Sequence, residues 1–67
     1  MIKGQRVTVK CGMQAKPATL VDIDKRKGKI WVKMFDEVLV LNWDEASGLY
    51  TKTAGRMTIS VGPDGLV

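Results

Sequence analysis

The stretch that decides the fold is Lys29-Ile30-Trp31-Val32-Lys33-Met34-Phe35, in which polar and apolar positions alternate. Ile30, Val32 and Met34 share one face, and the residues between them share the other. Alternation with a period of two is typical of a β-strand that buries one face. We therefore predict a strand over residues 29–35 that points the indole of Trp31 outward.

The pattern continues on both sides of this strand. Further strands are expected at residues 6–11, 18–24, 38–41, 49–51 and 57–61. The glycine-ended Lys25–Gly28 segment and the polar pair Asp36-Glu37 are predicted as turns on either side of the central strand. Trp43–Gly48 is predicted as one short helical or 3₁₀ turn. Gly62–Gly65 gives another turn signal, and Leu66-Val67 is expected as a tail or a last edge contact.

Five to six short antiparallel strands in 67 residues predict a closed or nearly closed barrel. Closure matters because open strand edges in so small a sheet promote aggregation. We expect one all-β domain over residues 1–67, with no helix longer than about two turns.

Composition restricts the chemistry that the chain can perform. There is no histidine, and Cys11 is the single cysteine, so neither a disulfide nor a Cys/His zinc site can form within the chain. Cys11 is expected as a small buried apolar residue on the first strand, in preference to a reactive thiol. We predict a protein that is not an enzyme, with no catalytic residues, metal site or cofactor.

The N-terminal segment bears on where the protein works. Residues 1–6 lack the apolar centre of a signal peptide, and no apolar run approaches the ~20 residues of a membrane span. A small domain without disulfides is typical of a reducing compartment. A cytoplasmic protein without a membrane partner is therefore expected.

Charge is distributed unevenly along the chain. Residues 1–33 carry nine Lys or Arg and two Asp, whereas residues 34–67 carry two Lys or Arg and five acidic residues, within a total net charge of +4. Such asymmetry indicates either a basic face for a polyanion or strands that neutralise one another.

The first half of the chain resembles a KOW motif. The residues that carry this resemblance are Gly4–Gly12, with its Val7-Thr8-Val9 strand, then Ala18–Ile23 and Lys29–Val32. The later segment Val32–Asp36 with Trp43 is similar to Tudor-type domains. The resemblance implies an SH3-like barrel, a fold that KOW and Tudor domains share, and it implies RNA among the partners.

The basic hairpin is the main candidate site. An outward Trp31 between lysines can stack on an unpaired base while cations meet phosphates. The other interpretation is that Trp31 closes one end of the core. The proposed nucleic-acid-binding residues are Lys10, Lys16, Lys25, Arg26, Lys27, Lys29, Trp31 and Lys33.

A second candidate is an aromatic pocket made by Phe35, Trp43 and Tyr50. In Tudor-like domains such aromatic residues form a cage for a methylated cation, which cation–π attraction holds. The simpler interpretation is that these side chains complete the core.

The leading functional prediction is a small module that binds RNA or single-stranded DNA through the basic hairpin. The alternative is a protein-interaction adaptor or inhibitor, of the size common among viral and plasmid-encoded proteins, that docks on a host protein. It would use its acidic loops or a strand edge at residues 38–41 or 57–61, edges that also suit a homodimer.

Overall fold

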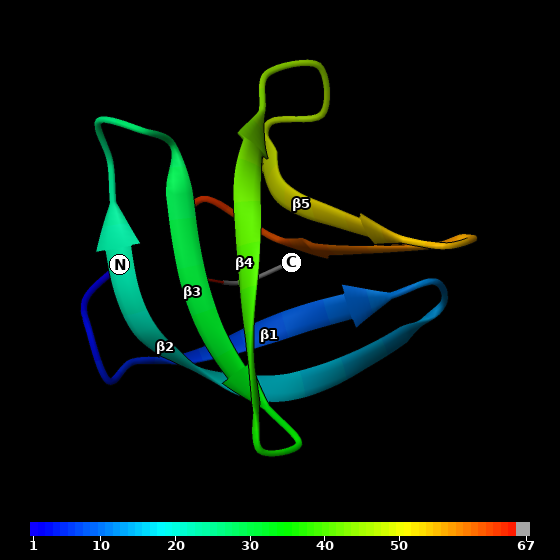
Figure 1. The fold of residues 1–67 in the computed structure, drawn as a ribbon, viewed down its shortest axis with the longest axis horizontal. Helices are drawn as coiled ribbons and strands as arrows, with labels where there is room; N and C mark the ends of the chain where they lie inside the picture. Colours follow the sequence, from blue (N-terminus) through cyan, green and yellow to red (C-terminus); the bar gives the residue numbers. More distant parts are fainter. Residues whose placement is uncertain (66–67) are drawn as a thin grey trace.

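The fold was established from a computed structural model that describes residues 1–65; the expected tail Leu66-Val67 lies outside the described residues. Six antiparallel strands form a closed barrel in which each strand pairs with the next and the last returns to the first (Figure 1). The all-β barrel predicted from the alternation is confirmed. The strands are β1 (Arg6–Cys11), β2 (Gln14–Asp24), β3 (Lys29–Met34), β4 (Glu37–Asp44), β5 (Leu49–Ala54) and β6 (Met57–Val61).

The core lies inside this ring and contains the inward half of each alternating pattern. Ile30 and Val32 of β3 are fully buried, as are Val7 and Val9 of β1. The remaining buried apolar side chains among the described residues are Ala18, Leu20, Leu41, Tyr50, Ile59 and Val61. Every strand therefore contributes to one core, and no buried polar side chain interrupts it in this part of the chain.

The turn between β3 and β4 differs by one residue from the prediction. Met34 pairs with Glu37, so the turn consists of Phe35 and Asp36, not Asp36 and Glu37. Both turn residues have positive φ, 53° and 61°, which is the signature of a type I′ hairpin turn. The sequence pattern missed this because a phenylalanine rarely occupies a left-handed turn position.

Strand β2 is longer than the predicted 18–24 segment and starts at Gln14. Residues 14–19 pair with β1, and residues 19–24 pair with β3, so Thr19 is shared by both ladders. Pro17 lies in the half of β2 that pairs with β1 alone. A proline, which has no backbone N–H, is tolerated there because no strand within residues 1–65 pairs with the other side of this half. A bulge between Leu20 and Asp22 turns the strand and leaves Val21 43% exposed.

Only Trp43 and Asp44 of the segment predicted as a helical turn, residues 43–48, belong to strand β4, and the remaining four residues form a turn but no helix. Trp43 and Asp44 pair with Tyr50 and Leu49, and a single turn follows, in which the Gly48 N–H donates to the Asp44 carbonyl at 2.8 Å. β5 then continues to Ala54, beyond the predicted 49–51 segment. Within residues 1–65 there is no helix that could cross a membrane.

Candidate functional site

The basic turn between β2 and β3 lies at one end of the barrel. Lys25, Arg26 and Lys27 are all exposed, and none of them forms an ion pair with a described residue. The Lys27 backbone N–H donates to the Asp24 side chain at 3.2 Å, which shapes the turn. Three unneutralised cations therefore project from one short, ordered turn.

Trp43 of β4 holds this turn in place. Its backbone N–H donates to the Gly28 carbonyl at 2.7 Å, which ties the turn to the neighbouring strand. Gly28 has φ +64°, and a Cβ there would come within 3.0 Å of the Trp43 Cβ. Glycine is favoured at this position, because a side chain would be strained both by this conformation and by so close an approach.

An open hollow of about 550 Å³ lies between the basic turn and Trp43. The Trp43 indole is 39% exposed and packs edge-to-face on buried Tyr50, with ring centroids 5.0 Å apart. The side chains that the hollow brings together are those of Lys25, Arg26, Lys27, Trp43, Glu45 and Pro63. The hollow thus combines a fixed aromatic ring with three cations and one carboxylate.

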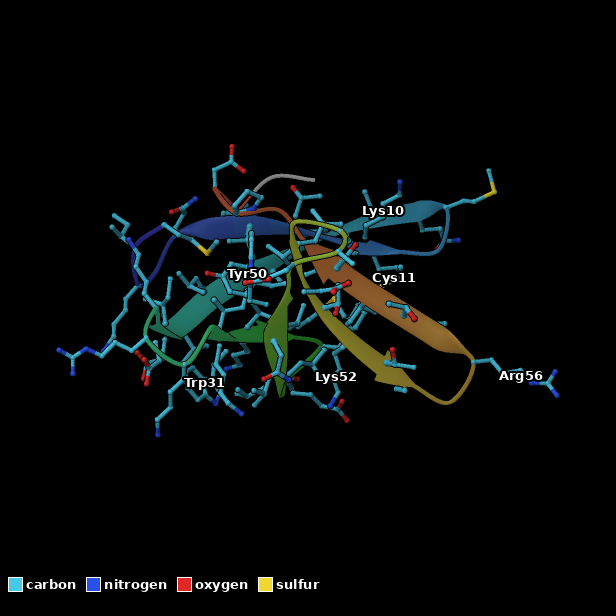
Figure 2. All side chains as sticks on the ribbon, turned by 90° about the horizontal axis from the view of Figure 1, so that it is seen from above. Lys10, Cys11, Trp31, Tyr50, Lys52 and Arg56 are labelled. Atoms are coloured by element: carbon cyan, nitrogen blue, oxygen red, sulfur yellow. The ribbon has the colours of Figure 1, made fainter. Side chains whose placement is uncertain are left out.

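Trp31 lies on the outward face of β3, as the alternation predicts, but it is half-buried. Figure 2 shows it at the periphery of the molecule, whereas Tyr50 lies inside the barrel. On its own strand, Lys33 is exposed and Lys29 is half-buried. On β2, Asp22 lies opposite Trp31 and Asp24 lies opposite Lys29. The face around Trp31 therefore carries carboxylates as well as lysines.

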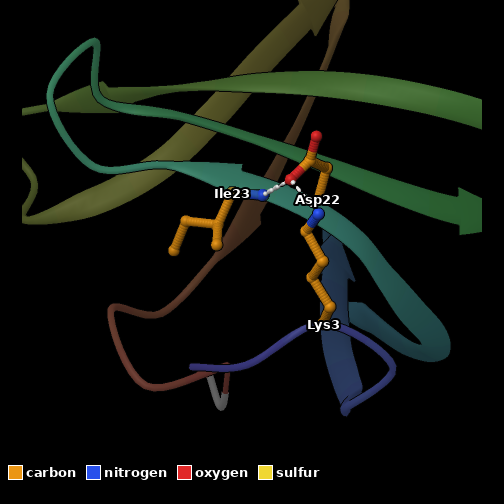
Figure 3. A network of polar contacts seen from close by, with 3 residues as sticks. All are labelled: Lys3, Asp22 and Ile23. Carbon is orange, nitrogen blue, oxygen red and sulfur yellow. Dashed lines mark hydrogen bonds and ion pairs between the residues drawn. The ribbon is translucent and has the colours of Figure 1, made fainter.

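Asp22 is held in its charged form by two neighbours (Figure 3). The Ile23 backbone N–H donates to its Oδ1 at 2.8 Å, and the Lys3 Nζ lies 3.3 Å from the same atom. The Ile23 hydrogen bond, followed by the Lys3 ammonium, lowers the pKa of the Asp22 carboxyl. Because this negative charge persists at neutral pH, it disfavours a phosphate beside Trp31.

The structure separates Lys10 and Lys16 from the basic turn. Both belong to the β1–β2 hairpin, and the β2–β3 turn follows the opposite end of the eleven-residue strand β2. Figure 1 shows the β1–β2 hairpin and the β2–β3 turn on opposite sides of the barrel, at the two ends of the curved strand β2. The Lys16 ammonium lies 4.9 Å from the centre of the Phe35 ring.

The predicted aromatic pocket is brought together only in part. Trp43 and Tyr50 are cross-strand partners, but Phe35 lies in the turn at the other end of β4. Phe35 therefore cannot join them in one cage. Instead, it lies with Lys16 at the edge of an apolar cleft of about 680 Å³, which the sequence analysis missed.

The sequence contained a signal that could have predicted the exposed apolar residues of this cleft. Met13 is fully exposed, Phe35 is 73% exposed and Met57 is 55% exposed. Met13 and Phe35 occupy two-residue hairpin turns, and Met57 directly follows one, at positions where polar residues are usual. Cys11 also lines the cleft and is half-buried, against the core, in place of the full burial that was expected.

Metal ligands and similar proteins are two further guides to function. Among residues 1–65, no group of three or more His, Cys, Asp or Glu side chains is placed to hold a metal ion. No protein-family model, curated protein or solved structure that was compared with the chain matches it. The geometry of the two ends of the barrel therefore provides the evidence on function.

Proposed function

We propose that this chain is a non-catalytic binding module that holds single-stranded nucleic acid across the hollow between the β2–β3 turn and Trp43. The observation that carries the proposal is the exposed, rigidly held Trp43 indole facing three cations that lack ion pairs with described residues. An unpaired base stacks on the indole, and the cations of residues 25–27 meet the flanking phosphates. The KOW resemblance of the first half of the chain fits an RNA ligand.

Trp43 is favoured over Trp31 as the stacking residue. Trp43 shares its hollow with one carboxylate, Glu45, whereas Trp31 lies beside the charged Asp22. The Gly28 hydrogen bond positions the Trp43 backbone and the Tyr50 ring packs against the Trp43 indole, so less side-chain freedom is lost on binding than for an unsupported indole. We see no set of side chains that reads base edges, and weak sequence preference is expected.

The test is a fluorescence titration with short oligo(U) and oligo(dT) strands. Loss of the basic turn in K25E/R26E/K27E should abolish binding, and Trp43→Ala should weaken it by about 1–3 kcal/mol, the contribution of one stacked base. Trp31→Ala serves as the control for indole loss and should bind almost as the wild type does.

A matched charge control separates local contacts from overall charge. K16E/K52E/R56E changes three cations at the other end of the barrel and lowers the net charge from +4 to −2, as K25E/R26E/K27E does. The proposal is wrong if both triple variants weaken binding equally, because the effect would then follow from net charge alone.

A further inference from the structure

The barrel opens at the end opposite the basic turn. The ladder between β4 and β5 covers only Asn42–Asp44 and Leu49–Thr51. Beyond it, Glu37–Leu41 pair with β3 alone and Lys52–Ala54 pair with β6 alone, in the part of the chain that the structure describes. Figure 1 shows the β3–β4 hairpin and the β5–β6 hairpin diverging there. The cleft of about 680 Å³ lies at this open end.

The unpaired stretch of β4 offers backbone hydrogen bonds. In an antiparallel strand, the N–H and C=O groups of alternate residues point to opposite sides. Every second residue of Glu37–Leu41 therefore points its backbone groups away from β3, toward the side where β5 has diverged. An extended segment of another chain can add to this edge as a further strand.

The side chains around the cleft are unusually apolar for a surface. Met13, Phe35 and Met57 line it and are between 55% and fully exposed, while Leu39 forms part of its floor against the core. Flexible methionines adapt to many apolar partners, and clustered exposed apolar groups mark interaction sites. Phe35 is held there at a φ of 53°, a backbone conformation that disfavours phenylalanine.

The charge of the cleft defines its partner. Lys16 and Lys52 line it, and Arg56 lines an adjoining hollow that shares Cys11 and Met57 with it. No aspartate or glutamate within residues 1–65 lines either of them; Asp36 and Glu37 of the neighbouring turn lie outside both. Figure 2 shows Arg56 at the tip of its hairpin, far from Trp31.

We infer that this cleft is a docking site for an extended segment of a partner protein that combines apolar and acidic side chains. The segment pairs with the free edge of β4, places its apolar side chains between Met13, Phe35 and Met57, and directs its carboxylates to Lys16, Lys52 and Arg56. The inference rests on different residues from the proposed nucleic-acid site, so either can fail without the other.

The test uses three fluorescein-labelled peptides of about eight residues, long enough to cover one strand. One alternates leucine and glutamate, one leucine and lysine, and one serine and glutamate. Fluorescence anisotropy should show saturable binding of the leucine–glutamate peptide, with at least about tenfold weaker binding of the other two. Bound peptide should also slow the reaction of the Cys11 thiol, which lines the cleft, with a thiol reagent.

Two variants locate the binding. Both K16E/K52E/R56E and Phe35→Asn should weaken the leucine–glutamate peptide about tenfold or more, while K25E/R26E/K27E should leave its affinity within about twofold. Phe35→Asn is chosen because asparagine suits the left-handed turn better than phenylalanine does, so this variant should fold. A loss of binding would then report on the missing ring. A thermal melt of each variant shows that the barrel is intact.

Each other outcome overturns the inference. Peptide affinity that is unchanged in K16E/K52E/R56E places the site elsewhere. Loss of oligonucleotide binding in the same variant, with no peptide binding in the wild type, assigns the cleft to a polyanion. Sedimentation that shows a dimer dissociated by Phe35→Asn assigns the cleft to a second copy of this chain.

Discussion

Replacing Phe35 by asparagine should make the protein more stable, although it removes a large apolar side chain. Phe35 has φ 53°, and a left-handed conformation costs roughly 1–2 kcal/mol for most residues. Asparagine still incurs part of this cost, so the backbone gain is about 1 kcal/mol. Phe35 is 73% exposed, and the Lys16 ammonium lies 4.9 Å from the centre of its ring. An exposed contact of this kind contributes about 0.5 kcal/mol, which leaves a net gain of about 0.5 kcal/mol.

The assay is urea denaturation of four proteins: the wild type, Phe35→Asn, Lys16→Thr and the double variant. Threonine suits a strand but is too short to reach the ring. For a slope of about 1 kcal/mol per molar urea, Phe35→Asn should raise the midpoint by about 0.5 M in the wild type. In the Lys16→Thr background, where no ammonium contact is lost, the rise should be about 1 M.

Two results would refute this reasoning. A lower midpoint for Phe35→Asn in both backgrounds would mean that the ring stabilises the turn by more than the backbone conformation costs. An equal rise in both backgrounds would mean that the contact between Lys16 and Phe35 contributes nothing measurable to the free energy of unfolding.

Three further predictions follow from the site and the turns. If the cations of residues 25–27 each meet one phosphate, raising salt from about 50 to about 200 mM should weaken oligo(U) binding about twentyfold, and a flat response would exclude these contacts. Gly28→Ala should cost about 1–2 kcal/mol, because φ is +64° and the new Cβ meets the Trp43 Cβ at 3.0 Å; a thermal melt that does not shift would contradict this. The Asp22 carboxyl, with its pKa lowered from 3.8, stabilises the fold above that value and loses this effect as pH falls through the lowered folded-state pKa. The difference in urea midpoint between wild type and Asp22→Asn should therefore shrink as pH falls below 3.8, and a constant difference would show that the charge of Asp22 is not involved.

The strands and the core could be predicted because alternation is a local property. Val7 and Val9, like Ile30 and Val32, are separated by one outward residue, and the period of two fixes which face they share. The ends of the strands were harder to predict from the sequence. The start of β2 at Gln14 was missed because Pro17 is normally excluded from paired strands, and only its position beside an unpaired edge makes it acceptable.

The candidate site depended on contacts that no local pattern contains. The cations of residues 25–27 were predicted from their clustering, but their aromatic partner was expected to be Trp31, four residues further along the chain from Lys27. Trp43 lies against the same turn because β3 and β4 are paired, and its N–H donates to the Gly28 carbonyl just beyond the Lys29–Asn42 pair. The cleft at the opposite end was missed for a similar reason, since Met13, Phe35 and Met57 come from three separate hairpins.

The order of the strands has a consequence for how the chain folds. Five of the six ladders join strands that are neighbours in the sequence, so each can form by closing a short loop at small entropic cost. The exception is the seam between β1 and β6, in which Lys10–Ser60 and Cys11–Ile59 are the ladder pairs among the described residues, and the Thr8 N–H also donates to the Gly65 carbonyl at 2.8 Å. Forming these two ladder pairs joins residues that are 50 and 48 positions apart in a chain of 67, because 60 − 10 is 50 and 59 − 11 is 48. We therefore expect the ring to close at this seam last, since its loop-closure entropy is the largest of the six ladders.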